Sequence, residues 1–102
     1  MFERVAFLKL TPTAATPETR RAIAARAFDV LRPLPGVQAL TVATAADADT
    51  ATAWDLCITA QFATPEDAAV YRAHPDHRRF VDEYVAPQCE ARKAWSFVGE
   101  RR

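Results

Sequence analysis

The same helix-start pattern occurs twice in this chain, and its two positions limit the possible order of the secondary-structure elements. Thr16-Pro17-Glu18 and Thr64-Pro65-Glu66 each join a capping side chain to a proline and an acid. A threonine hydroxyl accepts a hydrogen bond from a free N–H group, proline suits the first helical position, and an acid complements the positive end of the helix. Two helices are therefore expected, each preceded by an apolar segment.

Four apolar segments predict strands around these helices. Val5–Leu8, with Leu10, indicates a strand buried on both faces. The second strand is expected over 37–44 and the last over 93–98. The third segment alternates most clearly, with one face made of Trp54, Leu56, Ile58, Ala60 and Phe62 and the other of Asp55, Cys57, Thr59 and Gln61. Residues 45–53 read as a polar hairpin loop, and Pro35-Gly36 as the end of the first helix.

This order, βαββαβ, predicts an α+β ferredoxin-like fold. Two split βαβ halves form a four-stranded antiparallel sheet with both helices on one face. The other sheet face is then uncovered, and Leu8 and Leu40 are expected to belong to an apolar patch there. Soluble proteins normally bury such a patch in an interface, so we expect one domain over residues 1–102 that forms a homodimer.

Charge and composition exclude several classes of partner. Thirteen basic and thirteen acidic side chains give a formal net charge of zero, so no net field attracts nucleic acid or an anionic membrane. No apolar run approaches the roughly 20 residues of a membrane span, and the first residues do not resemble a secretory signal. We expect a cytoplasmic protein in which Cys57 and Cys89 are free thiols.

Both histidines lie in one short segment, Tyr71-Arg-Ala-His74-Pro75-Asp-His77-Arg-Arg-Phe80. Pro75 interrupts the second helical region, which is expected to end near His74 and to continue after the proline to about residue 86. In the continued helix, one face carries His77, Phe80, Val81 and Tyr84. An imidazole on an inward face needs a hydrogen-bond partner or a function.

This segment resembles the stress-responsive A/B barrel family, also called the dimeric α/β barrel or Dabb family. The resemblance extends to Phe7-Leu8-Lys9-Leu10, to the Leu34-Pro35-Gly36-Val37 turn and to the strand end at Phe62. It implies a homodimer in which two ferredoxin-like sheets pack face to face into a barrel. The family includes plant stress proteins and a plant polyketide cyclase that closes an aromatic ring without metal or cofactor.

The resemblance to that cyclase implies roles for several residues. His77 takes the position of its general base and Tyr71 that of the tyrosine that assists at the substrate, while His74 matches a neighbouring histidine. Arg4 stands where the cyclase has a further histidine in its first strand, which changes the charge and shape of the pocket mouth. We expect no cofactor and no metal site, because two histidines around a proline lack a third ligand.

Structural alternatives remain open for each candidate residue. His77 is either a base or a structural hydrogen-bonding group, His74 either a site residue or a helix cap, and Tyr71 either a donor or an aromatic plug. Trp54 either lines a pocket or packs in the core or dimer.

At the level of function, we favour a non-enzymatic dimer with a cleft for a small hydrophobic or aromatic molecule. The alternatives are a cofactor-free acid/base cyclase or isomerase and, with less support, a cofactor-free monooxygenase. An open cavity lined by both His77 and Tyr71 would favour binding or catalysis.

Overall fold

A computed structural model describes residues 1–100 of the chain. The four strands are β1 (Phe2–Leu10), β2 (Ala39–Thr44), β3 (Leu56–Phe62) and β4 (Cys89–Val98). The α-helices are α1 (Pro17–Leu31), α2 (Ala48–Ala53), α3 (Pro65–Ala73) and α4 (Pro75–Arg79). A π-helical turn (Phe80–Val85) and a 3₁₀ turn (Ala86–Gln88) connect α4 to β4.

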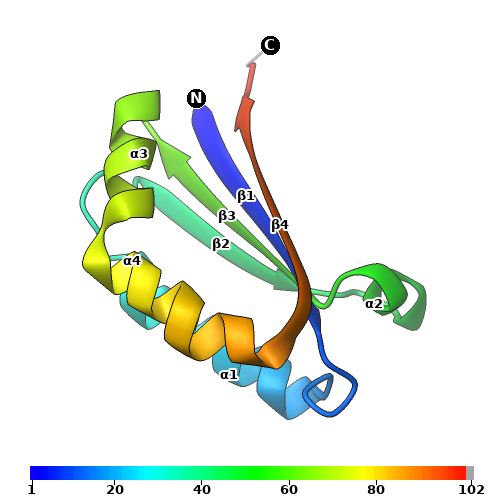
Figure 1. Ribbon diagram of the computed structural model, residues 1–102. Helices are drawn as coiled ribbons and strands as arrows, with labels where there is room; N and C mark the ends of the chain where they lie inside the picture. The colour runs from blue at the N-terminus through cyan, green and yellow to red at the C-terminus, as the bar shows by residue number, and fades with distance from the viewer. Residues whose placement is uncertain (101–102) are drawn as a thin grey trace.

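The strands form one antiparallel sheet in the order β2-β3-β1-β4. Helices α1, α3 and α4 lie on one face of this sheet, and α2 lies beyond one end of it (Figure 1). The first residues of β1 and the last residues of β4 lie side by side, since Phe2 pairs with Val98. The expected ferredoxin-like arrangement is confirmed.

Both helix starts have the expected caps. The Thr16 hydroxyl accepts a hydrogen bond from the Thr19 N–H at 3.1 Å, and the Thr64 hydroxyl accepts one from the Asp67 N–H at 3.1 Å. A proline follows each cap in the first turn, where its missing N–H has no helical partner to lose. The repeated threonine-proline-acid pattern thus fixes where α1 and α3 begin.

Helix α1 ends at Leu31, before the expected Pro35-Gly36. Pro33 cannot donate a helical hydrogen bond, and this accounts for the earlier end. Gly36 then has a φ of 85°, which side-chain-bearing residues rarely adopt, and it allows the chain to turn into β2. The buried core joins the helices to the sheet and includes Leu8, Leu10, Ile23, Ala27, Leu31, Leu56, Ile58, Phe62, Tyr71, Phe80 and Val85.

Residues 45–53 are not only a loop, as the sequence suggested, because they contain α2. Asp47 caps this helix by accepting the Thr50 N–H at 2.7 Å. Strand β3 therefore begins only at Leu56, and the expected alternation fails for the two residues before it. Trp54 does not join the core face, and Asp55 is completely buried instead of lying on the polar face.

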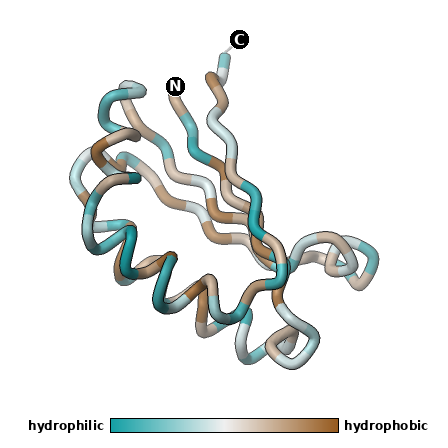
Figure 2. Tube along the Cα trace, in the orientation of Figure 1, coloured by the Kyte–Doolittle hydropathy of each residue, from teal (hydrophilic) through white to brown (hydrophobic). Residues whose placement is uncertain are grey.

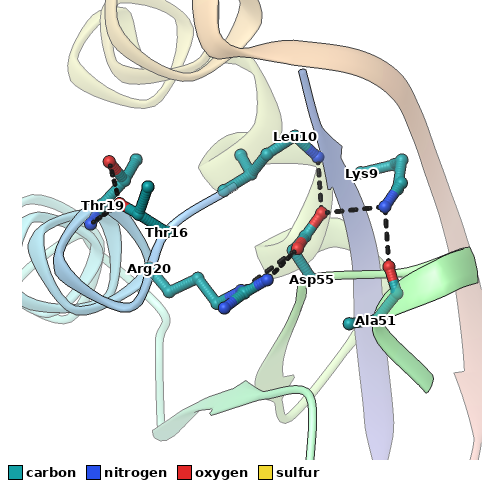
Figure 3. Close-up of polar contacts among 7 residues, drawn as sticks. All are labelled: Lys9, Leu10, Thr16, Thr19, Arg20, Ala51 and Asp55. Carbon is teal, nitrogen blue, oxygen red and sulfur yellow. Dashed lines mark hydrogen bonds and ion pairs between the residues drawn. The ribbon is translucent and has the colours of Figure 1, made fainter. Parts of the chain in front are cut away.

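Asp55 holds together the end of β1, the start of β3 and α1 (Figure 3). Its carboxylate accepts the Leu10 N–H at 2.7 Å and two donors of Arg20, Nε at 3.1 Å and Nη2 at 2.8 Å. The Lys9 ammonium lies 3.6 Å away and also donates to the Ala51 carbonyl at 2.6 Å. Burial raises the pKa of Asp55, but the hydrogen bonds from Leu10 and Arg20 and the two positive charges outweigh it, so the pKa lies below its ordinary value.

The second helical region bends as predicted and then departs from an α-helix. Helix α3 ends at Ala73, and α4 restarts at Pro75. In the π-helical turn that follows, Phe80 and Val85 are buried, five residues apart. The inward face expected for an α-helix is therefore rotated, and Tyr84 packs only at the edge of the core, against the Phe80 ring at 5.8 Å.

The uncovered sheet face differs in composition from the expectation. Leu8 and Leu40 are buried beneath the helices, so their assignment to the open face was wrong. Since side chains alternate along a strand, the open face instead carries Val5 and Phe7 of β1 and Trp95 and Phe97 of β4. Trp95 is 48% exposed and Phe97 is 52% exposed. Hydrophobic residues are spread along all four strands (Figure 2).

Candidate functional site

A cavity of about 860 Å³ lies between the helical segment and the sheet. Its walls come from β1 and β4 on one side and from α3, α4 and the π-helical turn on the other. Helices do not cover β4, whose residues 90–98 are all exposed. The apolar part of the wall consists of Ala6, Leu8, Ile58, Phe80, Val81 and Val85.

Tyr71 and His77 both line this cavity and contact each other. Their ring centroids are 4.6 Å apart with an interplanar angle of 54°. Tyr71 is 3% exposed and also meets the Phe62 ring edge-on at 5.0 Å. Burial raises the pKa of Tyr71 to about 12, although the charge of Arg4 opposes this effect. The phenol is therefore protonated at neutral pH and is available as a hydrogen-bond donor.

His77 has one ring nitrogen, Nδ1, that is buried and has no hydrogen-bond partner in the described part of the chain, residues 1–100. Burial lowers the pKa of His77, a hydrogen bond with the Arg72 backbone raises it, and the charges of Arg72, Arg78 and Arg4 lower it. The net effect is a pKa below the ordinary value, so the ring is neutral at pH 7.

Two arginines lie at the Tyr71 end of the cavity. Arg4, on β1, donates from Nη1 to the Ser96 hydroxyl on β4 at 3.2 Å. Burial and the charge of Arg72 lower the pKa of Arg4, while Tyr71 raises it. Arg72 lines the same cavity from α3. Arg72 was not among the site residues predicted from the sequence, although its position directly after Tyr71 in the His-Pro segment could have indicated it.

The other two predicted site residues lie outside the cavity. The His74 Nδ1 accepts the Asp76 N–H at 3.1 Å and caps α4, which is the structural alternative stated above. The Trp54 ring packs against Phe7 at 5.6 Å, and Phe7 belongs to the open sheet face. Because β3 starts at Leu56, Trp54 is not held on the cavity side of the sheet. The structure therefore brings Arg4, Tyr71 and His77 together and leaves His74 and Trp54 apart from them.

The cavity also contains Cys89, the first residue of β4. Burial raises the pKa of this thiol, which keeps it protonated and weakly nucleophilic at neutral pH. Cys57 and Cys89 are both free. Within residues 1–100, no group of three histidine, cysteine, aspartate or glutamate side chains is placed to hold a metal ion. No helix in this part of the chain is long and apolar enough to cross a bilayer.

The site thus combines an unpaired neutral imidazole with a protonated phenol in a cavity with apolar walls. The imidazole nitrogen can accept a proton or a hydrogen bond, and the phenol can donate a hydrogen bond to an oxygen. This pair can orient a polar group of a bound molecule or move a proton on it. The two arginines add positive charge beside the pair.

Comparison with known proteins identifies relatives of this fold. A Dabb family protein with a ferredoxin-like fold from Mesorhizobium loti is 19% identical, with a TM-score of 0.79, over 98% of this chain and 97% of that one. A dimeric ferredoxin-like protein of unknown function from Thermobifida fusca is 20% identical, with a TM-score of 0.79, over 94% and 88%. A hydroxynitrile lyase from Passiflora edulis is 12% identical, with a TM-score of 0.79, over 99% and 94%. At these identities the likeness shows the fold alone.

The family is established by a broader match. A search among curated proteins gave no match. The model of the stress responsive A/B barrel domain, Dabb, matches residues 2–98, which is nearly the whole sequence. The chain belongs to the stress responsive A/B barrel domain family.

Proposed function

We propose that this protein is a homodimer that binds a small hydrophobic or aromatic molecule in the cavity beside Tyr71 and His77. The observation that carries the proposal is that His77 lines a cavity of about 860 Å³ and that its buried Nδ1 has no hydrogen-bond partner among residues 1–100. Buried polar atoms are normally hydrogen-bonded, and an unpaired one costs roughly 1 to 3 kcal/mol. A ligand donor would remove this cost.

The size and walls of the cavity support the same proposal. Small-molecule sites are typically about 300 to 1,000 Å³, mostly apolar, with a few polar groups that fix orientation. Here the apolar wall includes Ile58 and Phe80, and the polar groups include those of Tyr71 and His77. Charged side chains, among them Arg92 and Lys93, also line the cavity. An aromatic ligand would contact the apolar wall and direct a hydroxyl or carbonyl toward the polar pair.

The homodimer is supported by the open sheet face. Exposed aromatic side chains gather there, and Phe7 contacts Trp95 at a ring distance of 6.1 Å. Such a patch on a small protein is usually covered by a partner. The Thermobifida fusca protein of the same fold is dimeric. We propose that two copies of this chain pack these faces together into a barrel.

A second candidate function is cofactor-free acid/base catalysis, which the protonation states favour. In a cyclisation or isomerisation of a keto-enol compound, His77 would take a proton from the carbon beside a carbonyl. Tyr71 would donate a hydrogen bond to the enolate oxygen that forms. A neutral imidazole and a protonated phenol in ring contact meet both needs. The cofactor-free monooxygenase is not proposed, because no contact among residues 1–100 favours it.

Titration with small phenols and β-keto compounds, followed by NMR and calorimetry, tests ligand binding. We expect His77→Ala and Tyr71→Phe each to weaken binding about tenfold, the effect of losing one hydrogen bond of about 1.4 kcal/mol. If His77 serves the ligand, His77→Ala should change the unfolding free energy by no more than about 1 kcal/mol. The matched control is His74→Asn, which keeps a capping side chain outside the cavity and should bind normally.

The same samples separate the two candidate functions. In D₂O, a base acting at the α-carbon of a β-keto ester accelerates deuterium exchange there, and this acceleration should disappear in His77→Ala. Ligand binding without accelerated deuterium exchange would support the binding function and contradict the catalytic one. Absence of binding across the panel, with a stability loss of roughly 1 to 3 kcal/mol in His77→Ala, would assign His77 a structural role and contradict both functions.

A further inference from the structure

We infer that Arg4 and Arg72 form an anion-binding subsite at the Tyr71 end of the cavity, and that the ligand carries a carboxylate in addition to its hydrophobic or aromatic body. This inference rests on the proposed ligand-binding function and specifies the class of ligand. It also assigns a role to Arg72, which neither caps α3 nor belongs to the buried core.

Arg4 is held in place by the sheet and faces the cavity. It lies in β1 opposite Ala60 of β3 and Ser96 of β4, on the face that the helices cover. Its only side-chain hydrogen bond among residues 1–100 is to the neutral Ser96 hydroxyl, and that bond uses Nη1. The half-buried guanidinium therefore keeps several donors for another acceptor.

Arg72 brings a second guanidinium to the same end of the cavity. It follows Tyr71 on α3, and its charge acts on both Arg4 and His77. None of the ion pairs within residues 1–100 includes Arg4 or Arg72. The charge of Arg72 acts on Arg4, so the two like charges lie near each other without an acidic partner among residues 1–100. Because Arg72 is exposed, water screens part of their repulsion, and a bound anion would relieve the rest.

The acidic side chains of the cavity lie elsewhere. Asp82, in the π-helical turn, pairs with Arg78 at 3.8 Å. Glu90 is at the start of β4, six residues before Ser96, which is roughly 20 Å along a strand. The cavity therefore has an excess of positive charge at the end where Arg4 and Tyr71 lie.

A carboxylate suits this end in charge and in shape. Guanidinium groups are planar and donate paired hydrogen bonds to the two oxygens of a carboxylate. The protonated Tyr71 phenol offers a further donor nearby. The unpaired His77 Nδ1 repels an anion and instead accepts a donor such as a ligand hydroxyl. The ligand is therefore expected to place its carboxylate at Arg4 and Arg72 and a hydroxyl or acidic carbon at His77.

Matched acids and amides test this subsite. We would titrate 4-hydroxybenzoate against 4-hydroxybenzamide, and 3-phenylpropionate against 3-phenylpropionamide, and follow cavity resonances by NMR. Each acid should bind at least tenfold more tightly than its amide, because a charge-assisted hydrogen bond typically contributes enough binding free energy for a tenfold difference in affinity. Arg4→Gln and Arg72→Gln should each remove most of this preference, and Arg4→Lys should retain part of it. The control Arg21→Gln removes an exposed charge outside the cavity and should retain the full preference.

A second measurement does not depend on the chosen ligand. Because Arg4 and Arg72 repel each other, Arg4→Gln should melt at the same or a higher temperature than the unmodified protein without ligand, whereas Arg21→Gln should not gain stability. A clear loss of stability in Arg4→Gln would make Arg4 a structural residue and overturn the subsite. Equal binding of acids and amides would overturn the subsite and leave the proposed function intact. Failure of acids and amides alike would contradict both.

Discussion

At the scale of single residues, the two histidines show how position decides chemistry. They are three residues apart in the sequence, on either side of Pro75. The His74 Nδ1 accepts a backbone N–H and caps α4, whereas the His77 ring contacts Tyr71 and its buried Nδ1 has no partner within the described residues 1–100. From their spacing alone, each histidine could have been either a helix cap or a residue of the site. The ends of α3 and α4 decide between them, because His74 is the residue between the two helices.

The lowered pKa of His77 predicts how stability depends on pH. In the unfolded chain the ring takes up a proton near pH 6.5, but in the folded protein it does so only at lower pH. Below about pH 6.5 the unfolded state therefore binds more protons, and the free energy of unfolding rises with pH. Stability should be greatest above this pH and fall as the pH drops through the folded pKa.

Urea unfolding between pH 5 and 8, at one fixed protein concentration, measures this effect. His77→Gln should flatten the dependence in that window. The lowered pKa of Asp55 acts near pH 4 and below, outside the window. If the His77→Gln curve kept the slope of the unmodified protein, the pH dependence would have to come from another group.

At the scale of elements, the contact that joins α1 to the sheet is the buried Asp55 with Arg20. Arg20→Ala would leave a completely buried carboxylate with Lys9 and the Leu10 N–H as partners. We expect a loss of about 3 kcal/mol, at the lower end for breaking a buried ion pair, because Lys9 remains. The neighbouring Arg21→Ala breaks only an exposed contact of 3.9 Å and should cost at most about 0.5 kcal/mol.

Thermal and denaturant unfolding of these two variants gives the comparison directly. They remove the same side chain from adjacent positions of α1, so helix propensity cancels. Similar losses in the two variants would show that Asp55 does not depend on Arg20. Loss of stability in Arg20→Ala alone would confirm that this ion pair holds α1 against the ends of β1 and β3.

The elements also show which local patterns the sequence predicts well. The starts of α1 and α3 and the break at Pro75 depend on residues within one turn, and the structure has them where they were expected. The π-helical turn over Phe80–Val85 was not predicted, because the apolar residues Phe80, Val81 and Tyr84 also fit the face of an α-helix, whereas the residues that are buried, Phe80 and Val85, are five apart. Asp55 was misplaced for a different reason. Its partner Arg20 is 35 residues away, and only the folded chain brings them together.

At the scale of the whole molecule, the order of strands and helices followed from the sequence, but the composition of the open face did not. Leu8 and Leu40 are apolar, yet apolar character does not tell which face of a strand a residue occupies. Register decides this, since a shift by one residue exchanges the two faces. The sequence predicted the cavity only conditionally, because its walls come from strands and helices that meet after folding. For the same reason Arg72 was recognised as a lining residue only in the structure.

The open face leads to a prediction about assembly. If two copies pack these faces together, Trp95 is buried in the dimer, and the midpoint of unfolding should rise with protein concentration. Trp95→Glu would place a charge in that interface and should yield a monomer by analytical ultracentrifugation, with reduced stability. The control Val70→Glu introduces the same charge at an exposed position of α3, on the opposite side of the sheet, and should remain dimeric. A stably folded monomer of the unmodified protein at micromolar concentration would contradict the homodimer, and the exposed Trp95 and Phe97 would then need a different partner.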